Sequence, residues 1–144
     1  MGSERLTAVN VLVVFYSRFG ATERLALAAA VGAVQGRANI RLRRLADAAD
    51  EGTIASMPGW LESRKRMNRQ YVTPREADVG WADAILVGIP AGSAEAALWS
   101  EWLKTLHAPA IVESFFPAED AADSVEAARL QGRATADAAR AAKV

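Results

Sequence analysis

The chain has 144 residues, no cysteine, one histidine and no net charge, with 17 basic and 17 acidic side chains. This length suits one domain over residues 1–144, and the lack of cysteine excludes disulfides, thiolate nucleophiles and thiolate-held metal sites. The balanced charge disfavours nucleic-acid binding. The absence of a long apolar run or a signal-like start predicts a cytoplasmic protein without a membrane partner.

The first predicted element is a strand at Val11–Tyr16, a continuous β-branched and aromatic run that is typical of a strand buried on both faces. A polar turn over residues 17–22 leads into a helix at Glu23–Gln35, which ends at Gly36. Alternating residues over 39–45 then predict a half-exposed strand near a sheet edge. Strand, helix and strand in this order predict a βαβ unit with parallel pairing.

Residues 46–80 are predicted to form a long excursion from the domain. It contains a short helix at Leu61–Gln70, with Trp60 and Met67 as its anchors, and a capping box at residues 73–76 that starts a further turn of helix. We interpret the basic residues of this segment as a solvated helix face, with a phosphate or nucleic-acid patch as the alternative. They are Arg64, Lys65, Arg66 and Arg69.

The second half of the chain predicts a buried strand at Ala84–Val87, a loop over 88–93 and an amphipathic helix over 93–106. A fourth strand at 110–116 precedes a final helix at 119–143. The residues expected to face inward from these two helices are Leu98, Trp102, Leu106, Ala127, Leu130, Ala134, Ala138 and Ala141.

Two weaker patterns in the last part of the chain have structural interpretations. Gly132 is expected to be a close-packing point of the final helix rather than a ligand contact. Acids near a helix start are expected to stabilise the helix dipole, so we predict no metal site there. These acids are Glu113, Glu119, Asp120, Asp123 and Glu126.

Two loops follow buried strands and are the candidate sites, because ligands of open parallel sheets bind outside the carboxyl ends of the strands. The loop Ser17–Thr22 has the composition of an anion site: Ser17 and Thr22 offer hydroxyl donors, Gly20 permits a tight turn, and a helix N-terminus follows. The alternative is a polar turn that caps the helix and binds nothing. The second candidate is the loop Gly88–Ser93.

The stretch VLVVFYSRFGATERLA resembles the first strand, phosphate loop and helix of flavodoxin-like proteins, in particular the NAD(P)H:quinone oxidoreductase branch also called the tryptophan-repressor-binding-protein family. In the same branch, IASMPGWLESRKRMNRQYVTPREADVGWADAILVGIP is similar to the inserted segment and third strand. AARLQGRATADAARAAK is similar to the last helix. The resemblance covers most of the chain and implies a three-layer, doubly wound, parallel α/β fold.

The resemblance further implies an FMN-binding oxidoreductase that reduces quinones or similar small acceptors with NAD(P)H, as a homodimer or higher oligomer. Because the flavin performs the hydride chemistry, no side chain has to be an acid, base or nucleophile. Phe19 matches an aromatic that helps line the nicotinamide side, and His107 matches a histidine near the flavin in one of two alignments. The residues that would hold the phosphate or lie against the ring are Ser17, Arg18, Phe19, Gly20, Ala21, Thr22, Pro90, Ala91, Gly92 and Ser93.

The chain departs from this family after the third strand. The family usually reads Gly-Thr-Pro-Thr-Arg-Phe-Gly there, whereas this chain reads Gly88-Ile-Pro-Ala-Gly-Ser-Ala94, and no glycine-rich loop follows between Leu98 and Asp123. We therefore expect four strands instead of five, with a second copy of the chain covering the exposed edge. The alternative function is a flavin-free scaffold that serves as a binding or assembly module or has a changed small-molecule activity.

Overall fold

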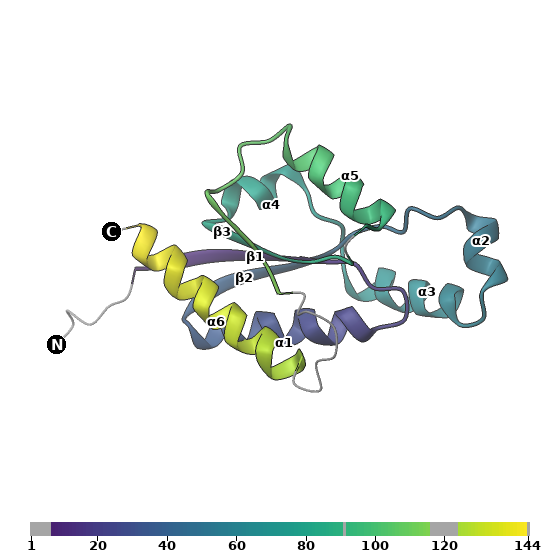
Figure 1. Ribbon diagram of the computed structural model, residues 1–144, viewed down its shortest axis with the longest axis horizontal. Coiled ribbons are helices and arrows are strands. Elements are labelled where there is room, and N and C mark those ends of the chain that lie inside the picture. Colours follow the sequence, from purple (N-terminus) through teal and green to yellow (C-terminus); the bar gives the residue numbers. More distant parts are fainter. Residues whose placement is uncertain (1–6, 91, 116–123, 144) are drawn as a thin grey trace.

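A computed structural model describes residues 7–90, 92–115 and 124–143. In these parts of the chain, parallel strands form one sheet in the order β2-β1-β3-β4 (Figure 1). This order matches the first four strands of the flavodoxin-like order 2-1-3-4-5, so it confirms the predicted four-stranded doubly wound fold. The strands are β1 (Val9–Phe15), β2 (Ala38–Arg44), β3 (Ala84–Gly88) and β4 (Ile111–Ser114).

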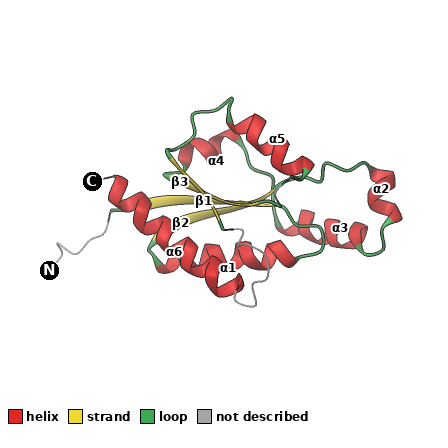
Figure 2. Cartoon of the chain, viewed as in Figure 1, coloured by secondary structure: helices red, strands yellow, loops and turns green. Residues whose placement is uncertain are grey.

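Helices cover both faces of the sheet and extend beyond one end of it (Figures 1 and 2). On one face lie α1 (Ala21–Gln35) and α6 (Ser124–Ala142), and on the other lie α4 (Glu76–Trp81) and α5 (Ala94–Leu103). The helices α2 (Glu51–Ser56) and α3 (Trp60–Gln70) lie beyond the carboxyl ends of β1 and β3. The excursion predicted at residues 46–80 therefore places two helices at the end of the sheet where ligands are expected.

The central strand β1 is buried on both faces, as its continuous apolar sequence predicts. Val11 and Val13 belong to the core under α1 and α6, whereas Leu12 and Val14 belong to the core under α4 and α5. All four side chains are fully buried. This alternation follows from the period of two along a strand, and it gives each face of the sheet its own core.

The helices α1 and α6 pack backbone to backbone through two glycines. A Cβ atom at Gly132 would lie 1.9 Å from the carbonyl oxygen of Ala29, and one at Gly32 would lie 1.8 Å from that of Arg129. The prediction that Gly132 is a close-packing point is therefore confirmed. Other small buried residues of the two helices surround this contact: Ala26, Ala33, Ala128 and Ala136.

The face predicted for the helix over 93–106 is partly confirmed, whereas the face predicted for the final helix is wrong. Trp102 and Leu106 pack against the core as predicted, but Leu98 is exposed and its neighbour Trp99 is buried in the core instead. In α6, the contact between Gly132 and α1 fixes the rotation of the helix. The buried residues of α6 are consequently Ala128, Gly132, Thr135, Ala136 and Ala139.

The capping box predicted at residues 73–76 is also wrong, because α4 begins at Glu76 and its N-cap is Arg75. The Asp78 carboxylate accepts the backbone N–H of Arg75 at 2.9 Å and ion-pairs with Arg41 and Arg43 at 3.1 and 3.0 Å. These pairs attach α4 to the edge strand β2. They also place charge along that edge, which protects it from pairing with another strand.

Two features of the excursion bear on its sequence interpretation. Trp60 and Met67 are fully buried, which confirms them as the anchors of α3, but α2 is an additional helix that the sequence pattern did not reveal. Within the described residues, no helix combines the length and the apolar character needed to span a membrane.

Candidate functional site

The two candidate loops lie side by side at the carboxyl ends of β1 and β3. The N–H of Tyr16 donates to the carbonyl of Gly88 at 3.0 Å, so the loops leave the sheet from neighbouring positions. A cavity of about 270 Å³ lies between them. Its position is the point where the strand order reverses, which is where open α/β sheets bind ligands. The cavity is lined by Tyr16, Ser17, Arg18, Phe19, Ala21, Thr22, Pro90, Ser93 and Glu95.

The first loop makes a tight turn that ends at the N-terminus of α1. The buried Ser17 hydroxyl oxygen accepts the N–H of Gly20 at 2.9 Å, and Gly20 has a φ of 111°, a left-handed conformation that favours glycine. Because α1 begins at Ala21, its first-turn N–H groups have no partners within the helix, and its positive dipole end lies at the cavity. The loop therefore presents free backbone N–H groups and the positive end of α1 to the cavity, and its use as an anion site stays a prediction.

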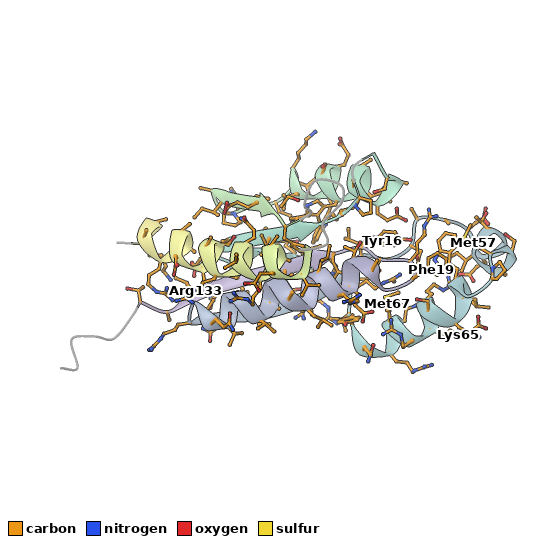
Figure 3. All side chains as sticks on the ribbon, turned by 60° about the horizontal axis from the view of Figure 1, so that its bottom comes forward. Tyr16, Phe19, Met57, Lys65, Met67 and Arg133 are labelled. Atoms are coloured by element: carbon orange, nitrogen blue, oxygen red, sulfur yellow. The ribbon has the colours of Figure 1, made fainter. Side chains whose placement is uncertain are left out.

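Arg18 and Phe19 extend from this loop towards the excursion. The guanidinium carbon of Arg18 lies 4.3 Å from the centre of the Trp60 ring, a cation–π arrangement. Phe19 is 54% exposed and lies at the same end of the molecule as Met57 (Figure 3). The excursion thus forms a second wall beside the loop, and an apolar ring is left in solvent next to the cavity.

A buried polar network attaches the excursion to the end of β1. The Tyr16 hydroxyl donates to Asp47 Oδ1 at 2.6 Å, and the indole N–H of Trp60 donates to the same oxygen at 3.2 Å. Arg44 Nη2 donates to the Ser17 carbonyl at 2.8 Å and ion-pairs with Asp47 at 3.2 Å. Burial, followed by the hydrogen bond to Asp47, raises the pKa of Tyr16 far above its usual value. This phenol therefore stays protonated above pH 10, where an exposed tyrosine would ionise.

A second cluster joins the start of α1 to α3. Two nitrogens of Arg66 donate to the two carboxylate oxygens of Glu23 at 2.7 and 3.1 Å, and the Tyr71 hydroxyl donates to Oε2 at 2.6 Å. The hydrogen bonds from Arg66 lower the pKa of Glu23, so this acid remains ionised. The negative charge of Glu23 near the N-terminus of α1 is thus neutralised by the guanidinium of Arg66.

The basic residues of α3 do not gather into a phosphate-binding patch. Besides the Arg66–Glu23 pair, Arg64 makes a bidentate pair with Glu51 at 2.8 Å. Lys65 is exposed and points away from the body of the molecule (Figure 3). The interpretation as a simple solvated face is therefore incomplete, because two of the arginines hold the excursion together.

The second loop contributes less than the sequence suggested. Pro90 lines the cavity, and Ser93 does so while its hydroxyl donates to the Pro90 carbonyl at 2.7 Å and accepts the N–H of Ala96 at 3.1 Å, which caps α5. Gly92 has a φ of 77° and is exposed, without lining the cavity. Ala91 lies outside the described residues.

His107 is not brought to this cavity. It is exposed and lies in the connection between α5 and β4, before the amino end of β4. In a parallel sheet that end is opposite the carboxyl ends, where the two loops lie. The match of His107 to a flavin-side histidine therefore finds no support in the geometry.

Glu95 and Tyr16 are cavity residues that sequence reasoning missed. Glu95 is 4% exposed, and its Oε2 accepts the backbone N–H of Ala48 at 2.8 Å. An acid in the first turn of a helix is already explained by the helix dipole, so its sequence position carried no separate signal. Tyr16 appeared only as the last residue of a buried strand.

The described residues contain no group of three or more side chains suited to hold a metal ion. Glu113 faces the neighbouring helix, where the Thr135 hydroxyl donates to it at 3.4 Å. Three of the other acids named in the sequence analysis, Glu119, Asp120 and Asp123, lie outside the described residues.

Neither protein-family models nor curated proteins give a match to this chain. Among solved structures, a diflavin flavoprotein A3 from Nostoc sp. is 15% identical, with a TM-score of 0.45 over 92% of this chain and 94% of that one. A flavodoxin from the domain Archaea is 13% identical, with a TM-score of 0.42 over 90% and 98%. The flavodiiron protein from Giardia intestinalis is 17% identical, with a TM-score of 0.45 over 92% of this chain and 36% of that one. The fold class stated above rests on the strand order and connections rather than on these likenesses.

Proposed function

We propose that this chain is an FMN-binding oxidoreductase whose cofactor phosphate binds at Ser17–Thr22. The observation that carries the proposal is the cavity between this loop and Pro90–Ser93, at the reversal of strand order. Oxyanions suit the N-terminus of a helix, where free N–H groups and the positive dipole end coincide. The resemblance of the stretch VLVVFYSRFGATERLA to the phosphate loop of flavodoxin-like proteins makes FMN the first phosphate-bearing candidate.

The residues around the cavity fit such a ligand in two ways. At the α1 end, Thr22 offers a hydroxyl beside the first-turn N–H groups, and Arg18 lines the cavity with a positive charge that lies over the Trp60 ring. At the α5 end, the Glu95 carboxylate is an acceptor suited to the hydroxyl groups of a sugar-alcohol chain. When bound, FMN would supply the hydride chemistry.

The chain itself would orient the ligand and exclude water. The Ser17–Gly20 hydrogen bond holds the loop in its turn, and the Arg44 contact to the Ser17 carbonyl fixes where the loop begins. Phe19 would cover an apolar part of the ligand, because its ring is exposed beside the cavity.

Within this proposal, NAD(P)H is the electron donor and a quinone or similar small molecule the acceptor, as the sequence resemblance implies. We also propose a cytoplasmic homo-oligomer. The oligomer is supported by β4, which is an edge strand of four residues with an exposed Val112. Unpaired backbone groups and an apolar side chain at such an edge favour contact with a second copy. Light scattering at micromolar concentration tests the assembly, and a monomer would count against it.

FMN binding can be measured by quenching of flavin fluorescence on titration with the purified chain. We expect saturable quenching by the wild type and its loss in Gly20→Val, because a branched side chain is strained at a φ of 111°. Gly80→Ala is the matched control, since a Cβ atom there meets nothing within 4 Å. If the wild type fails to quench FMN, the oxidoreductase proposal is rejected.

Turnover is tested separately, with FMN-loaded protein, NADPH and benzoquinone. NADPH oxidation that depends on both FMN and benzoquinone is the expected result. Binding of FMN without turnover would leave a flavin carrier and would overturn the proposed reaction.

Two observations favour the alternative of a flavin-free scaffold. The buried Glu95 carboxylate lines the same cavity, and its negative charge opposes a phosphate placed close to it. A cavity of about 270 Å³ is also at the small end of ligand sites, which usually measure about 300–1,000 Å³. A chain that binds inorganic phosphate or a small polar molecule but not FMN would support this second function.

A further inference from the structure

A second cavity, of about 310 Å³, lies beside α5 on the face of the sheet opposite α1 and α6. Its walls come from α5, from the chain just after β2 and from the segment before α4. Trp99 and Trp102 line it with ring centres 5.7 Å apart and planes tilted by 53°. Leu98 is 61% exposed and Pro74 forms part of the opposite wall. Apart from one residue, these walls are apolar or uncharged.

That residue is Glu95, the one charged side chain that lines this cavity. It is almost completely buried, and Ala48 N–H donates to its Oε2. Among the described residues, no ion pair includes Glu95. A buried carboxylate without a cation loses much of its hydration, and the positive end of α5 together with one hydrogen bond restores only part of that loss. A positively charged group in the cavity would therefore be favoured.

We propose that this cavity binds a small organic cation, an amine with an aromatic body, whose ammonium group meets Glu95 and whose ring packs against Trp99 and Trp102. Charge-assisted hydrogen bonds and aromatic contacts are the two interactions that favour such a ligand. The site differs from the phosphate-binding loop and does not depend on flavin binding. It makes an anionic or carbonyl-rich aromatic ligand unfavourable here, because such groups present oxygen atoms to the carboxylate.

The size of the cavity fits a ligand of this kind. A volume of about 310 Å³ lies at the lower end of the usual range for small-molecule sites. Three separate segments contribute the walls, and the cavity is open to solvent beside the exposed Leu98, so a ligand can enter there. Because Glu95 lines both cavities, the binding experiment is made without flavin and then repeated with FMN.

Phenethylamine is a suitable probe, with 2-phenylethanol as its neutral counterpart and phenylacetate as its anionic counterpart. The assigned indole N–H signals of the protein report binding in ¹H–¹⁵N spectra. We expect phenethylamine to shift the Trp99 and Trp102 signals saturably and to leave Trp60 unchanged, because Trp60 is buried in the excursion. We expect the affinity for 2-phenylethanol to be at least tenfold weaker, since it cannot form the charged pair.

Glu95→Gln should reduce the affinity for phenethylamine at least tenfold, and its amide oxygen can still accept the Ala48 N–H. Glu101→Gln on the same helix is the matched control, because Glu101 is exposed and should leave the affinity unchanged. If Glu95→Gln does not fold by near-ultraviolet circular dichroism, Leu98→Lys replaces it as the test. An exposed lysine at the edge of the cavity supplies a competing cation and should weaken phenethylamine binding.

Equal affinities for phenethylamine and 2-phenylethanol would overturn the proposal, because they would show an apolar cavity without charge selectivity. Stronger binding of phenylacetate, or no change of the Trp99 and Trp102 signals with any of the three probes, would also overturn it. Loss of binding on addition of FMN, with FMN binding intact, would show that the two ligands compete at Glu95. Failure of FMN binding alone leaves the amine site standing.

Discussion

The two faces of the sheet are packed in different ways. On one face, α1 and α6 meet through glycine and alanine, with Gly132 in contact with the backbone of Ala29. On the other, α5 packs through Trp99 and Trp102, and this face borders a cavity of about 310 Å³. Small residues let helices approach without gaps, whereas a few large rings leave spaces between them.

The contrast separates a closely packed region from one that contains cavities. Both cavities described above include Glu95 of α5, and one of them also includes the loop before α1. The excursion is joined to this region by buried polar contacts around Asp47, rather than by apolar packing alone. The α1–α6 face is therefore closely packed, whereas the carboxyl end of the sheet and the α5 face contain the two cavities for which ligands are proposed above.

The largest effect is expected where the excursion is joined to the sheet. Asp47→Ala should lower the free energy of unfolding by about 3–5 kcal/mol, because it leaves the buried Arg44 without its ion-pair partner. Urea unfolding measures this change. Glu51→Gln, which removes the exposed pair with Arg64, is the control and should leave the stability unchanged. An Asp47→Ala variant as stable as the wild type would show that the network does not hold the excursion.

The rotation of α5 predicts opposite results for two neighbouring residues. Trp99→Ala should destabilise the protein by about 3–5 kcal/mol, because it removes a large buried ring from the core. Leu98→Ala should change the stability by less than about 0.5 kcal/mol, because that side chain is exposed. Thermal unfolding of the two variants compares them directly. Equal losses would mean that the helix presents a different face to the sheet.

The close approach of α1 and α6 makes a prediction of intermediate size. Gly132→Ala should destabilise the protein by about 1–3 kcal/mol, because the added methyl group meets the Ala29 carbonyl. The same substitution at Gly80 in α4 should stabilise it by about 0.5–1 kcal/mol, since the methyl group enters open space and alanine favours a helix. The denaturant midpoints of the two variants, compared with that of the wild type, test both predicted changes in stability. A neutral Gly132→Ala would refute backbone contact between these helices.

The smallest effect is a titration. Burial, followed by the hydrogen bond to Glu23, raises the pKa of Tyr71 from 10.0 to about 12. The stabilisation linked to this phenol is therefore fully present below pH 10.0 and is lost as the pH rises through about 12. Absorbance at 295 nm should show no tyrosinate in the folded protein at pH 10, and Glu23→Gln should lower the pKa of Tyr71. Tyrosinate at pH 10 with the fold intact would contradict this contact.

The sequence predicted the strands and their parallel pairing because these depend on local patterns, and it placed the candidate loops at one edge of the sheet. The apolar run of β1, the alternation of β2 and the Ser17–Thr22 turn each have a recognisable period or composition. Parallel pairing then follows from the βαβ order. These rules place the two loops at one edge of the sheet without further information.

The parts that the sequence did not predict depend on contacts distant in the chain. The rotation of α6 is set by Gly132 against Ala29, and a stripe of alanines looks similar when displaced by one residue. Asp47 becomes buried only because Trp60 and Tyr16 meet it from separate segments. Glu95 enters the cavities in the same way, through the chain after β2. The spacing of residues within a single helix or strand gives no information about these contacts.

The most direct test of a phosphate-binding loop compares FMN with riboflavin, which lacks the phosphate, by fluorescence quenching under identical conditions. We expect FMN to bind at least tenfold more tightly to the wild type, because charge-assisted hydrogen bonds to N–H groups are the main difference between the two ligands. The ratio of the affinity for FMN to the affinity for riboflavin should fall in Thr22→Ala. It should stay unchanged in Ser56→Ala, which removes an exposed hydroxyl elsewhere. Equal affinities for FMN and riboflavin, or binding of neither, would contradict a phosphate site at Ser17–Thr22.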